Sequence, residues 1–482
     1  MSVPEDVLYG SIRELSEAIR TRRLSPVELA EAYLQRLEQL GPRLGAVVTI
    51  TRERALREAR AAEREIAGGQ WRGPLHGVPY GVKDLLSTAG DLTTWGAAPY
   101  REQRFDFDAT IVQRLTKAGA VLVAKLAMIE LAGGFGYRQA DASFTGPART
   151  PWNLGYWAGG SSSGPGAAVA AALVPFAIGS ETWGSITTPC AFSGVTGLRP
   201  TYGRVSRHGA MALSWSMDKL GPMCRTADDC GLILAAIAGP DPLDPSASTR
   251  EYAYARDSST PRRFRIGVLK NATAGVQEEV AASFEASLRA LAEFADLVPD
   301  VELPDHPYAM AASLIIDAEG ASAFEDLLEA GRAALLTAPE DRHGGYSGTT
   351  VFAKDYLKAI RLRGAMGRDL DAVFARYDAV VSPTRGTVAF PIGKPFNEAW
   401  PNVPVPPGTR TQPLGAAANV AGLPGLAVPN GFGREGLPTS ITFTGRVFEE
   451  NRLIAAASAY QDRTDWHRRR PPIAGANSPP PR

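Results

Sequence analysis

The chain has 482 residues, of which 44% are hydrophobic and 21% charged, so it has enough apolar side chains for a large core. Its 51 Lys and Arg residues balance 51 Asp and Glu residues, leaving no net field that would gather nucleic acid or an anionic membrane. Its longest apolar run, residues 167–178, is broken by Pro175 and is well short of the roughly 20 residues that cross a bilayer.

Two further features bear on where the protein works. The N-terminal segment has early acidic residues and no apolar stretch of a secretory signal, which predicts a cytoplasmic protein. The three cysteines have neither disulfide-framework nor zinc-ligand spacing, and we expect reduced thiols: Cys190, Cys224 and Cys230. We therefore expect no metal and no cofactor.

The first 70 residues are predicted to be helical. Ser25 stands at a capping position, with Pro26 at the first helical position, Glu28 completing a capping box, and apolar residues at helical spacing up to Gly41. A second helix, rich in Arg and Glu, is expected at about residues 52–67, where a pair of glycines ends it.

Short apolar runs then alternate with Gly-rich loops between residues 75 and 240. Strands are expected within residues 77–86 and 119–126. A third strand is expected at residues 174–178, leading into a tight loop at 179–188. This alternation predicts an α/β fold.

Four further elements are expected in the second half of the chain. Residues 262–269 begin a strand-like segment, and residues 377–384 have the pattern of a buried strand. Residues 279–295 and 316–336 have the pattern of long helices. No internal repeat is present, so the chain is not a repeat protein.

Three serines in the stretch GGSSSG, residues 159–164, raise the question of a nucleophile. The stretch fits the G-x-S-x-G elbow of an α/β-hydrolase, which would make Ser162 the nucleophile. That elbow needs a buried strand directly before it, whereas the preceding residues suit a loop. A phosphate-binding loop is excluded as well, because no lysine follows the glycines as that motif requires.

Ser185, within the loop predicted at 179–188, is the other candidate nucleophile, because the N–H groups before it could stabilise an oxyanion. No motif ties a histidine to it; the five histidines are His76, His208, His306, His343 and His467. A lysine can replace histidine as the base when burial lowers its pKa. Lys83 and Lys125 both lie in expected strands, and spacing alone does not decide between them.

An ordered set of motifs extends over almost the whole chain. In sequence order they are GPLHGVPYGVKD, GGSSSG, GSETWGSI, GLRPTYGRVSRHG, SMDKLGP, NVAGLPGLAVPNGF and TDWHRRRP. This set resembles the amidase signature family. The resemblance implies an α/β fold with a large mixed β-sheet core, helices on both of its faces and a helical N-terminus.

The resemblance also implies one amidase-signature domain over residues 1–470. Its parts are a helical N-terminal part (1–70), a catalytic core (71–240), a variable part that shapes the substrate site (241–415) and a segment that completes the core (416–470). Residues 471–482 are expected to form a disordered tail.

In that family the catalytic unit is a Ser-cisSer-Lys triad. Carried over, the resemblance makes Lys83 the base, Ser161 the bridging serine after a cis peptide bond, and Ser185 the nucleophile that forms an acyl-enzyme. Ser161 rather than Ser162 is thus the serine of GGSSSG that takes part in the chemistry. The implied oxyanion hole consists of the backbone N–H groups of Thr182, Trp183, Gly184 and Ser185.

The nucleophile loop departs from the family pattern at two positions. Trp183 replaces a glycine, and Thr187 replaces an arginine whose expected partner is the acid at position 181. The backbone donors are unaffected, so we expect an altered pocket and retained catalysis. A non-catalytic binding protein is disfavoured because all three triad positions are occupied.

The expected function is a stand-alone amidase, a hydrolase of non-peptide C–N bonds that could also accept esters or carbamates. The alternative is the glutamine-hydrolysing A subunit of a glutamyl-tRNA amidotransferase. Segments typical of that protein are not found at residues 342–378, which favours the stand-alone enzyme. The expected partners are a small-molecule amide, ester or carbamate, with no nucleic acid, no membrane, and a homodimer as a candidate assembly.

Overall fold

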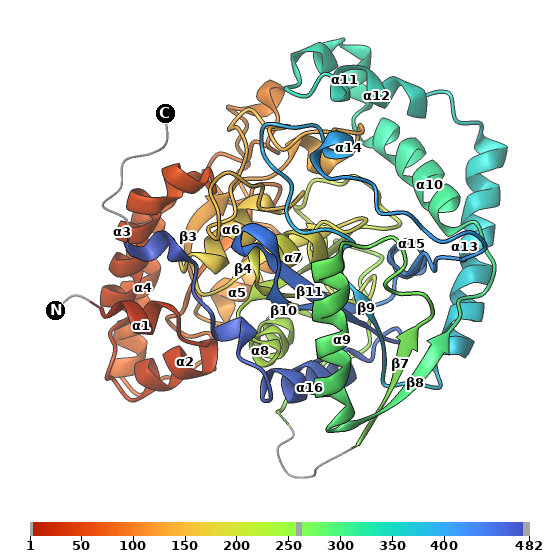
Figure 1. Ribbon diagram of the computed structural model, residues 1–482. Helices are drawn as coiled ribbons and strands as arrows, with labels where there is room; N and C mark the ends of the chain where they lie inside the picture. Colours follow the sequence, from red (N-terminus) through yellow and green to blue (C-terminus); the bar gives the residue numbers. More distant parts are fainter. Residues whose placement is uncertain (1–2, 257–262, 476–482) are drawn as a thin grey trace.

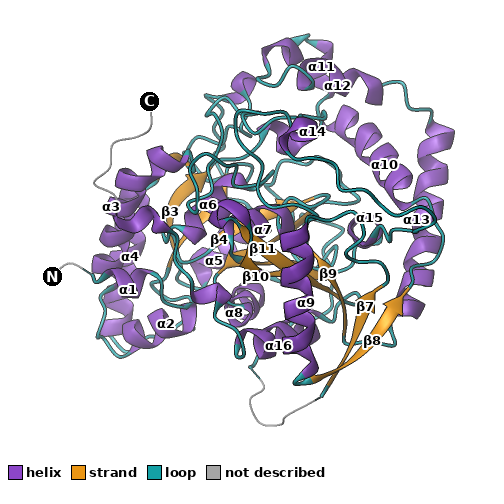
Figure 2. Ribbon diagram, viewed as in Figure 1, coloured by secondary structure: helices purple, strands orange, loops and turns teal. Residues whose placement is uncertain are grey.

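The computed structural model describes residues 3–256 and 263–475. Within these residues one mixed sheet has eleven strands in the order β1-β3-β2-β4-β6-β5-β10-β11-β9-β7-β8 (Figures 1 and 2). Its strands are β1 (Val47–Ile50), β2 (Pro79–Lys83), β3 (Val121–Leu126), β4 (Ala177–Glu181), β5 (Thr196–Arg199), β6 (Lys219–Cys224), β7 (Phe264–Leu269), β8 (Ala295–Val301), β9 (Ala379–Pro383), β10 (Gly425–Phe432) and β11 (Pro438–Thr444).

The helices surround this sheet (Figure 2). They are α1 (Glu5–Leu8), α2 (Ile12–Arg20), α3 (Pro26–Leu44), α4 (Arg52–Ala67), α5 (Thr110–Lys117), α6 (Ser163–Ala170), α7 (Thr187–Ser193), α8 (Ala227–Ile237), α9 (Glu278–Ala292), α10 (Tyr308–Ala323), α11 (Glu325–Glu329), α12 (Asp341–Gly348), α13 (Ala353–Phe374), α14 (Phe396–Ala399), α15 (Leu414–Val420) and α16 (Glu450–Gln461).

Both faces of the sheet are buried. On β10, Leu426 and Val428 belong to a core cluster that includes α5, α8 and α16, whereas Ala427 between them belongs to a second cluster with α4, α6 and α7. Successive strand residues point to opposite faces, so the two clusters lie on opposite sides of the sheet. The predicted mixed sheet with helices on both faces is confirmed.

The N-terminal helices follow their sequence signals closely. Ser25 caps α3 by accepting hydrogen bonds from the backbone N–H groups of Val27 and Glu28. The helix continues past Gly41 and ends at Gly45, which has the left-handed φ of +59° common at helix ends. Helix α4 has the predicted bounds. The strand β1 between these helices is absent from the prediction, although its sequence, VVTI, is rich in β-branched residues.

Two elements differ from their predictions. The strand expected at residues 174–178 is β4, which begins at Ala177 and extends to Glu181, because its hydrogen-bonded pairing with β6 runs from Ala177 to Glu181. The helix expected at residues 316–336 begins earlier, at Tyr308, and is divided: α10 and α11 are followed by Gly331, whose φ is +66°. A continuous helix cannot contain that left-handed residue.

Helices α10, α13 and α15 build a third apolar cluster beside β9 (Figure 1). Of the tail predicted at 471–482, residues 476–482 lie outside the described residues, while Ile473 is buried against the core. No helix among the described residues is long and apolar enough to span a membrane.

Candidate active site

Lys83 is the last residue of β2, a strand buried along its whole length between β3 and β4. Its Nζ lies 2.7 Å from Ser161 Oγ and 2.9 Å from Ser180 Oγ. Burial lowers the pKa of Lys83 to about 7, although the charges of Asp218 and Glu181 oppose this shift. A substantial share of Lys83 is therefore neutral near pH 7 and can accept a proton.

Ser161 is held in a tightly packed turn. The peptide bond Gly160–Ser161 is cis. A Cβ at Gly160 would lie 2.6 Å from the Trp157 ring and 2.9 Å from Ile129, so only glycine fits there. The carbonyl of Ser161 accepts a hydrogen bond from the Ile129 N–H at 3.1 Å. These contacts fix the backbone that presents the Ser161 hydroxyl to Lys83.

Ser185 lies in the loop that follows β4. The Ser162 N–H donates to the Ser185 carbonyl at 3.2 Å, which joins this loop to the turn containing Ser161. Gly184 has a φ of +88°, a left-handed conformation that favours glycine. The Ser185 hydroxyl makes no hydrogen bond to any residue that the structure describes. The structure thus pairs Lys83 with Ser161, while the Ser161–Ser185 hydrogen bond is not formed.

The carboxylate of Glu181, at the start of the nucleophile loop, binds backbone N–H groups at the end of that loop. One oxygen accepts from the backbone N–H groups of Ile186 and Thr187 at 2.9 and 3.0 Å, and the other accepts from Arg199 at 2.8 Å. Although burial opposes its ionisation, Arg199 and Lys219 hold the pKa of Glu181 at about 2. Arg199 on β5 is therefore the cationic partner of Glu181 in this chain, in which Thr187 stands where the family pattern has an arginine.

The loop also presents unused hydrogen-bond donors. In the described part of the chain, the N–H groups of Trp183, Gly184 and Ser185 have no acceptor. Three neighbouring N–H groups that have no protein acceptor and lie beside a serine hydroxyl are suited to stabilise an oxyanion.

Three polar residues behind the loop lie within the motifs GSETWGSI and SMDKLGP, but the sequence analysis assigns them no role. Ser180 is the second hydroxyl at Lys83. Asp218 accepts from the Thr182 hydroxyl at 2.5 Å, and Lys219 donates to the Thr182 carbonyl at 3.3 Å. Strand β6 brings the last two residues to the loop, because its pairing with β4 sets Lys219 opposite Glu181. That register cannot be read from the sequence.

Ser162 and Lys125, the rival candidates for the nucleophile and the base, bond to groups outside the proposed triad. The Ser162 hydroxyl is fully buried and bonds the backbone of Ser180, donating to its carbonyl at 3.2 Å and accepting from its N–H at 3.3 Å. Lys125 Nζ donates to the carbonyls of Leu86 and Leu92 at 2.8 and 3.0 Å and lies 3.2 Å from Asp84. Neither side chain hydrogen-bonds to Ser161 or Ser185.

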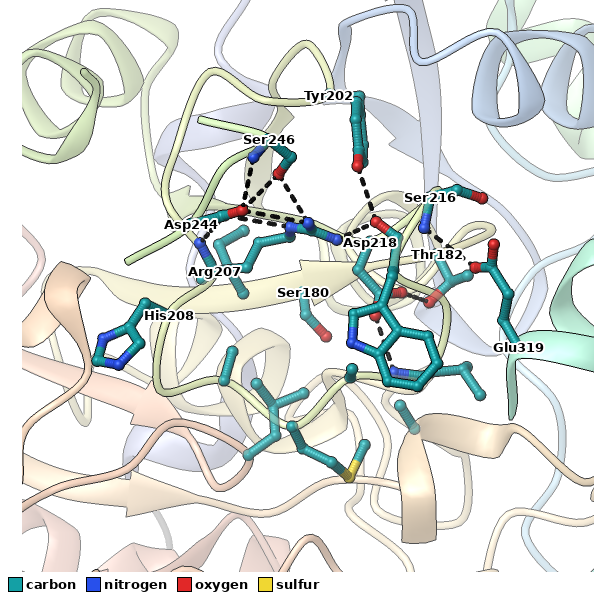
Figure 3. Close-up of a pocket in the computed structure, with 18 of the residues that line it drawn as sticks. Ser180, Thr182, Tyr202, Arg207, His208, Ser216, Asp218, Asp244, Ser246 and Glu319 are labelled. Atoms are coloured by element: carbon teal, nitrogen blue, oxygen red, sulfur yellow. Dashed lines mark hydrogen bonds and ion pairs between the residues drawn. The ribbon is translucent and has the colours of Figure 1, made fainter. Parts of the chain in front are cut away.

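Two cavities lie near the loop. One, of about 310 Å³, is lined by Ser185, Trp183, Gly160 and several aromatic side chains. The other, of about 610 Å³, is shown in Figure 3 and reaches Ser180 and Thr182. In it, Arg207 is already bound to Asp244 and Ser246. Of the two cavities, only the smaller one is lined by Ser185.

Comparisons with known proteins identify the family of this chain. The sequence pattern of the Amidase family matches residues 28–454, and the chain belongs to this family, the amidase signature enzymes. It is 37% identical to the A subunit of the glutamyl-tRNA(Gln) amidotransferase of Moorella thermoacetica, over 98% of this chain and 100% of that protein.

Solved structures are similar over nearly the whole chain. The native peptide amidase of Stenotrophomonas maltophilia is 33% identical with a TM-score of 0.81, covering 96% of this chain and 98% of that one. A structure described as a vestigial protein complex that reveals the origins of an s-triazine catabolic enzyme is 32% identical with a TM-score of 0.84, covering 94% and 98%.

These relatives correct one expectation. The sequence predicts a small-molecule amide, ester or carbamate with no nucleic acid, yet the curated relatives are subunits of an amidotransferase named for glutamyl-tRNA(Gln). The balanced charge behind the prediction describes the field of this chain alone. It does not exclude a nucleic acid held by other subunits of an assembly.

Proposed function

We propose that this chain hydrolyses a carboxylic amide with Lys83 as the base, Ser161 as the proton relay and Ser185 as the nucleophile. The observation that carries the proposal is the buried contact of 2.7 Å between Lys83 Nζ and Ser161 Oγ, made by a lysine whose pKa burial lowers to about 7. A charged lysine could not accept the proton, whereas a neutral one can.

The proposed reaction uses two proton transfers and one acyl-enzyme. Neutral Lys83 takes the proton of Ser161, Ser161 takes the proton of Ser185, and Ser185 Oγ attacks the amide carbon. The N–H groups of Trp183, Gly184 and Ser185, and that of Thr182 in the family pattern, stabilise the oxyanion. The proton returns through Ser161 to the leaving nitrogen, the C–N bond breaks, and water then hydrolyses the ester on Ser185.

For the substrate, we propose first the side-chain amide of glutamine, with the chain acting as the A subunit of a glutamyl-tRNA(Gln) amidotransferase. The full-length similarity to such subunits supports this choice. Hydrolysis of glutamine would release ammonia for a partner protein to use.

A second candidate is an amidase that acts without partner subunits. The similarity to the peptide amidase supports it. So does the cavity at Ser185, which carries Trp183, Trp157, Phe390 and Phe396 and therefore suits an acyl group with apolar surface.

The test is ammonia release from glutamine and from a set of aryl and alkyl amides, measured with wild type and Ser185→Ala. We expect turnover by wild type and none by Ser185→Ala at an unchanged thermal midpoint. Stimulation of glutamine hydrolysis by glutamyl-tRNA and a co-purifying protein would favour the first substrate. An active Ser185→Ala protein would contradict the proposed mechanism.

A further inference from the structure

Arg385 is a cation in the cavity of Ser185 that the mechanism leaves unused. It follows β9 and lines the same cavity of about 310 Å³ as Ser185 and Trp183. Nearby protein atoms lower the pKa of the guanidinium, although Arg385 as a whole is exposed to solvent. An exposed cation that lines the cavity of Ser185 can be reached by a substrate.

The backbone on either side of Arg385 is firmly held. The Thr384 N–H donates to the Ser440 carbonyl at 2.9 Å, and the Gly386 carbonyl accepts from the Gln277 N–H at 2.8 Å. The Thr384 hydroxyl also lies 2.8 Å from the Thr442 hydroxyl. The arginine is thus placed at a fixed position beside the sheet rather than on a loose loop.

The guanidinium itself has no partner. Within the described residues Arg385 makes no hydrogen bond and no ion pair. The acid that affects its pKa, Glu181, already accepts from Arg199, Ile186 and Thr187. The rest of the cavity wall is mostly aromatic or aliphatic, with Tyr137 as the other titratable neighbour.

An arginine offers five N–H donors in a planar fork that fits a carboxylate with two parallel hydrogen bonds. No described residue accepts a hydrogen bond from those donors, so the guanidinium has no protein partner in this cavity. An anion brought in by the substrate would supply that partner. Arg207 in the adjacent cavity illustrates the contrast, since Asp244 already pairs with it.

Resting on the proposed function, we propose that the amide substrate carries a carboxylate on its acyl part and that Arg385 binds this carboxylate while Ser185 attacks the amide carbon. Because both groups line one cavity of about 310 Å³, only a short chain separates the carboxylate from the amide. Glutamine meets this requirement, as do the monoamides of short dicarboxylic acids.

The test compares each anionic monoamide with its neutral counterpart: succinamate with butyramide, and glutaramate with pentanamide. We expect wild type to favour the anionic member by about 10- to 100-fold in kcat/KM, the value of a charge-assisted pair. Arg385→Leu should remove this preference and leave the neutral amide nearly unchanged, while Arg385→Lys should keep part of it. Arg376→Leu, at an exposed surface arginine, removes the same charge and should keep the preference.

A preference that is absent in wild type, or that survives in Arg385→Leu, would overturn the inference and leave the amidase proposal intact. If no amide is hydrolysed, the amidase proposal fails and calorimetry decides the inference. Glutaramate should then bind the Ser185→Ala protein at least about tenfold more tightly than the protein with Arg385→Leu added. Equal binding to the two proteins would overturn it.

Discussion

Two neighbouring strands of the sheet each bury a lysine, and the surroundings of the two differ. Val82 pairs with Lys125 and Lys83 pairs with Leu126, so the two lysines point to opposite faces of the sheet. Lys83 meets two hydroxyls, whereas Lys125 meets two carbonyls, the Thr93 hydroxyl and the Asp84 carboxylate. Burial lowers the pKa of both, but only Lys125 has a carboxylate within contact distance among the residues described.

This contrast separates a lysine placed for proton transfer from one placed for stability. A carboxylate beside an ammonium favours its charged form, so the Lys125–Asp84 pair is a structural ion pair. A hydroxyl accepts a hydrogen bond from a charged lysine and donates one to a neutral lysine, so it favours neither charge state strongly. Burial is therefore insufficient to identify a catalytic lysine, and the nature of its partners decides.

The largest expected effect is that of removing Lys83. We expect Lys83→Ala to lower kcat/KM by about 10²- to 10⁴-fold, the usual contribution of a general base. Lys83→Arg should be nearly as damaging, because a guanidinium stays protonated. Steady-state rates with the best amide substrate check this. Native-like activity of Lys83→Arg would contradict the role of Lys83.

Lys125→Met should act on stability instead. Removing one member of a buried ion pair typically costs about 3–5 kcal/mol, because the partner charge of Asp84 stays buried. Denaturant unfolding measures this loss, and the folded fraction should keep kcat within a few-fold of wild type. A stable but inactive Lys125→Met protein would reverse the assignment of the two lysines.

The pH dependence should follow Lys83. Because the neutral lysine is the active form and its pKa is about 7, kcat/KM should fall as the pH drops below 7 and level off above about 8. At pH 6 the rate should be about a tenth of the plateau. The Lys125→Met protein should keep this profile. A rate that falls with rising pH between 6 and 8 would rule out a neutral lysine base.

The smallest expected effect concerns the two serines beside the triad. Ser180→Ala removes a hydrogen-bond partner of Lys83 and should lower kcat/KM by about 2- to 10-fold. Ser162→Ala removes a hydroxyl that bonds the backbone of β4, so it should cost about 1 kcal/mol of stability and little activity. Equal rate losses in both variants would show that Ser180 acts only through packing.

The fold is largely predictable because its signals are local. The N-terminal cap of α3 and the strand containing Lys83 each follow from adjacent residues. The start of β4 is misplaced in the prediction because its bounds depend on pairing with β6, which lies about forty residues further along the chain.

The site is predictable only through the family resemblance. Spacing alone cannot choose Lys83 over Lys125, since the choice depends on the partners, Ser161 and Asp84, that the fold brings to the two side chains. The motifs contain Ser180 and Arg199 but assign them no role, and Arg385 lies outside the motifs. The roles of all three residues come from tertiary contacts.

The most direct test of Lys83 as the base and Ser185 as the nucleophile is labelling by a serine-directed fluorophosphonate, followed by peptide mapping in wild type, Lys83→Arg and Lys125→Met. We predict modification of Ser185 in wild type and in folded Lys125→Met, with labelling slowed by orders of magnitude in Lys83→Arg. Modification of Ser161 or Ser162 in place of Ser185, or rapid labelling of Ser185 in Lys83→Arg, would contradict these assignments.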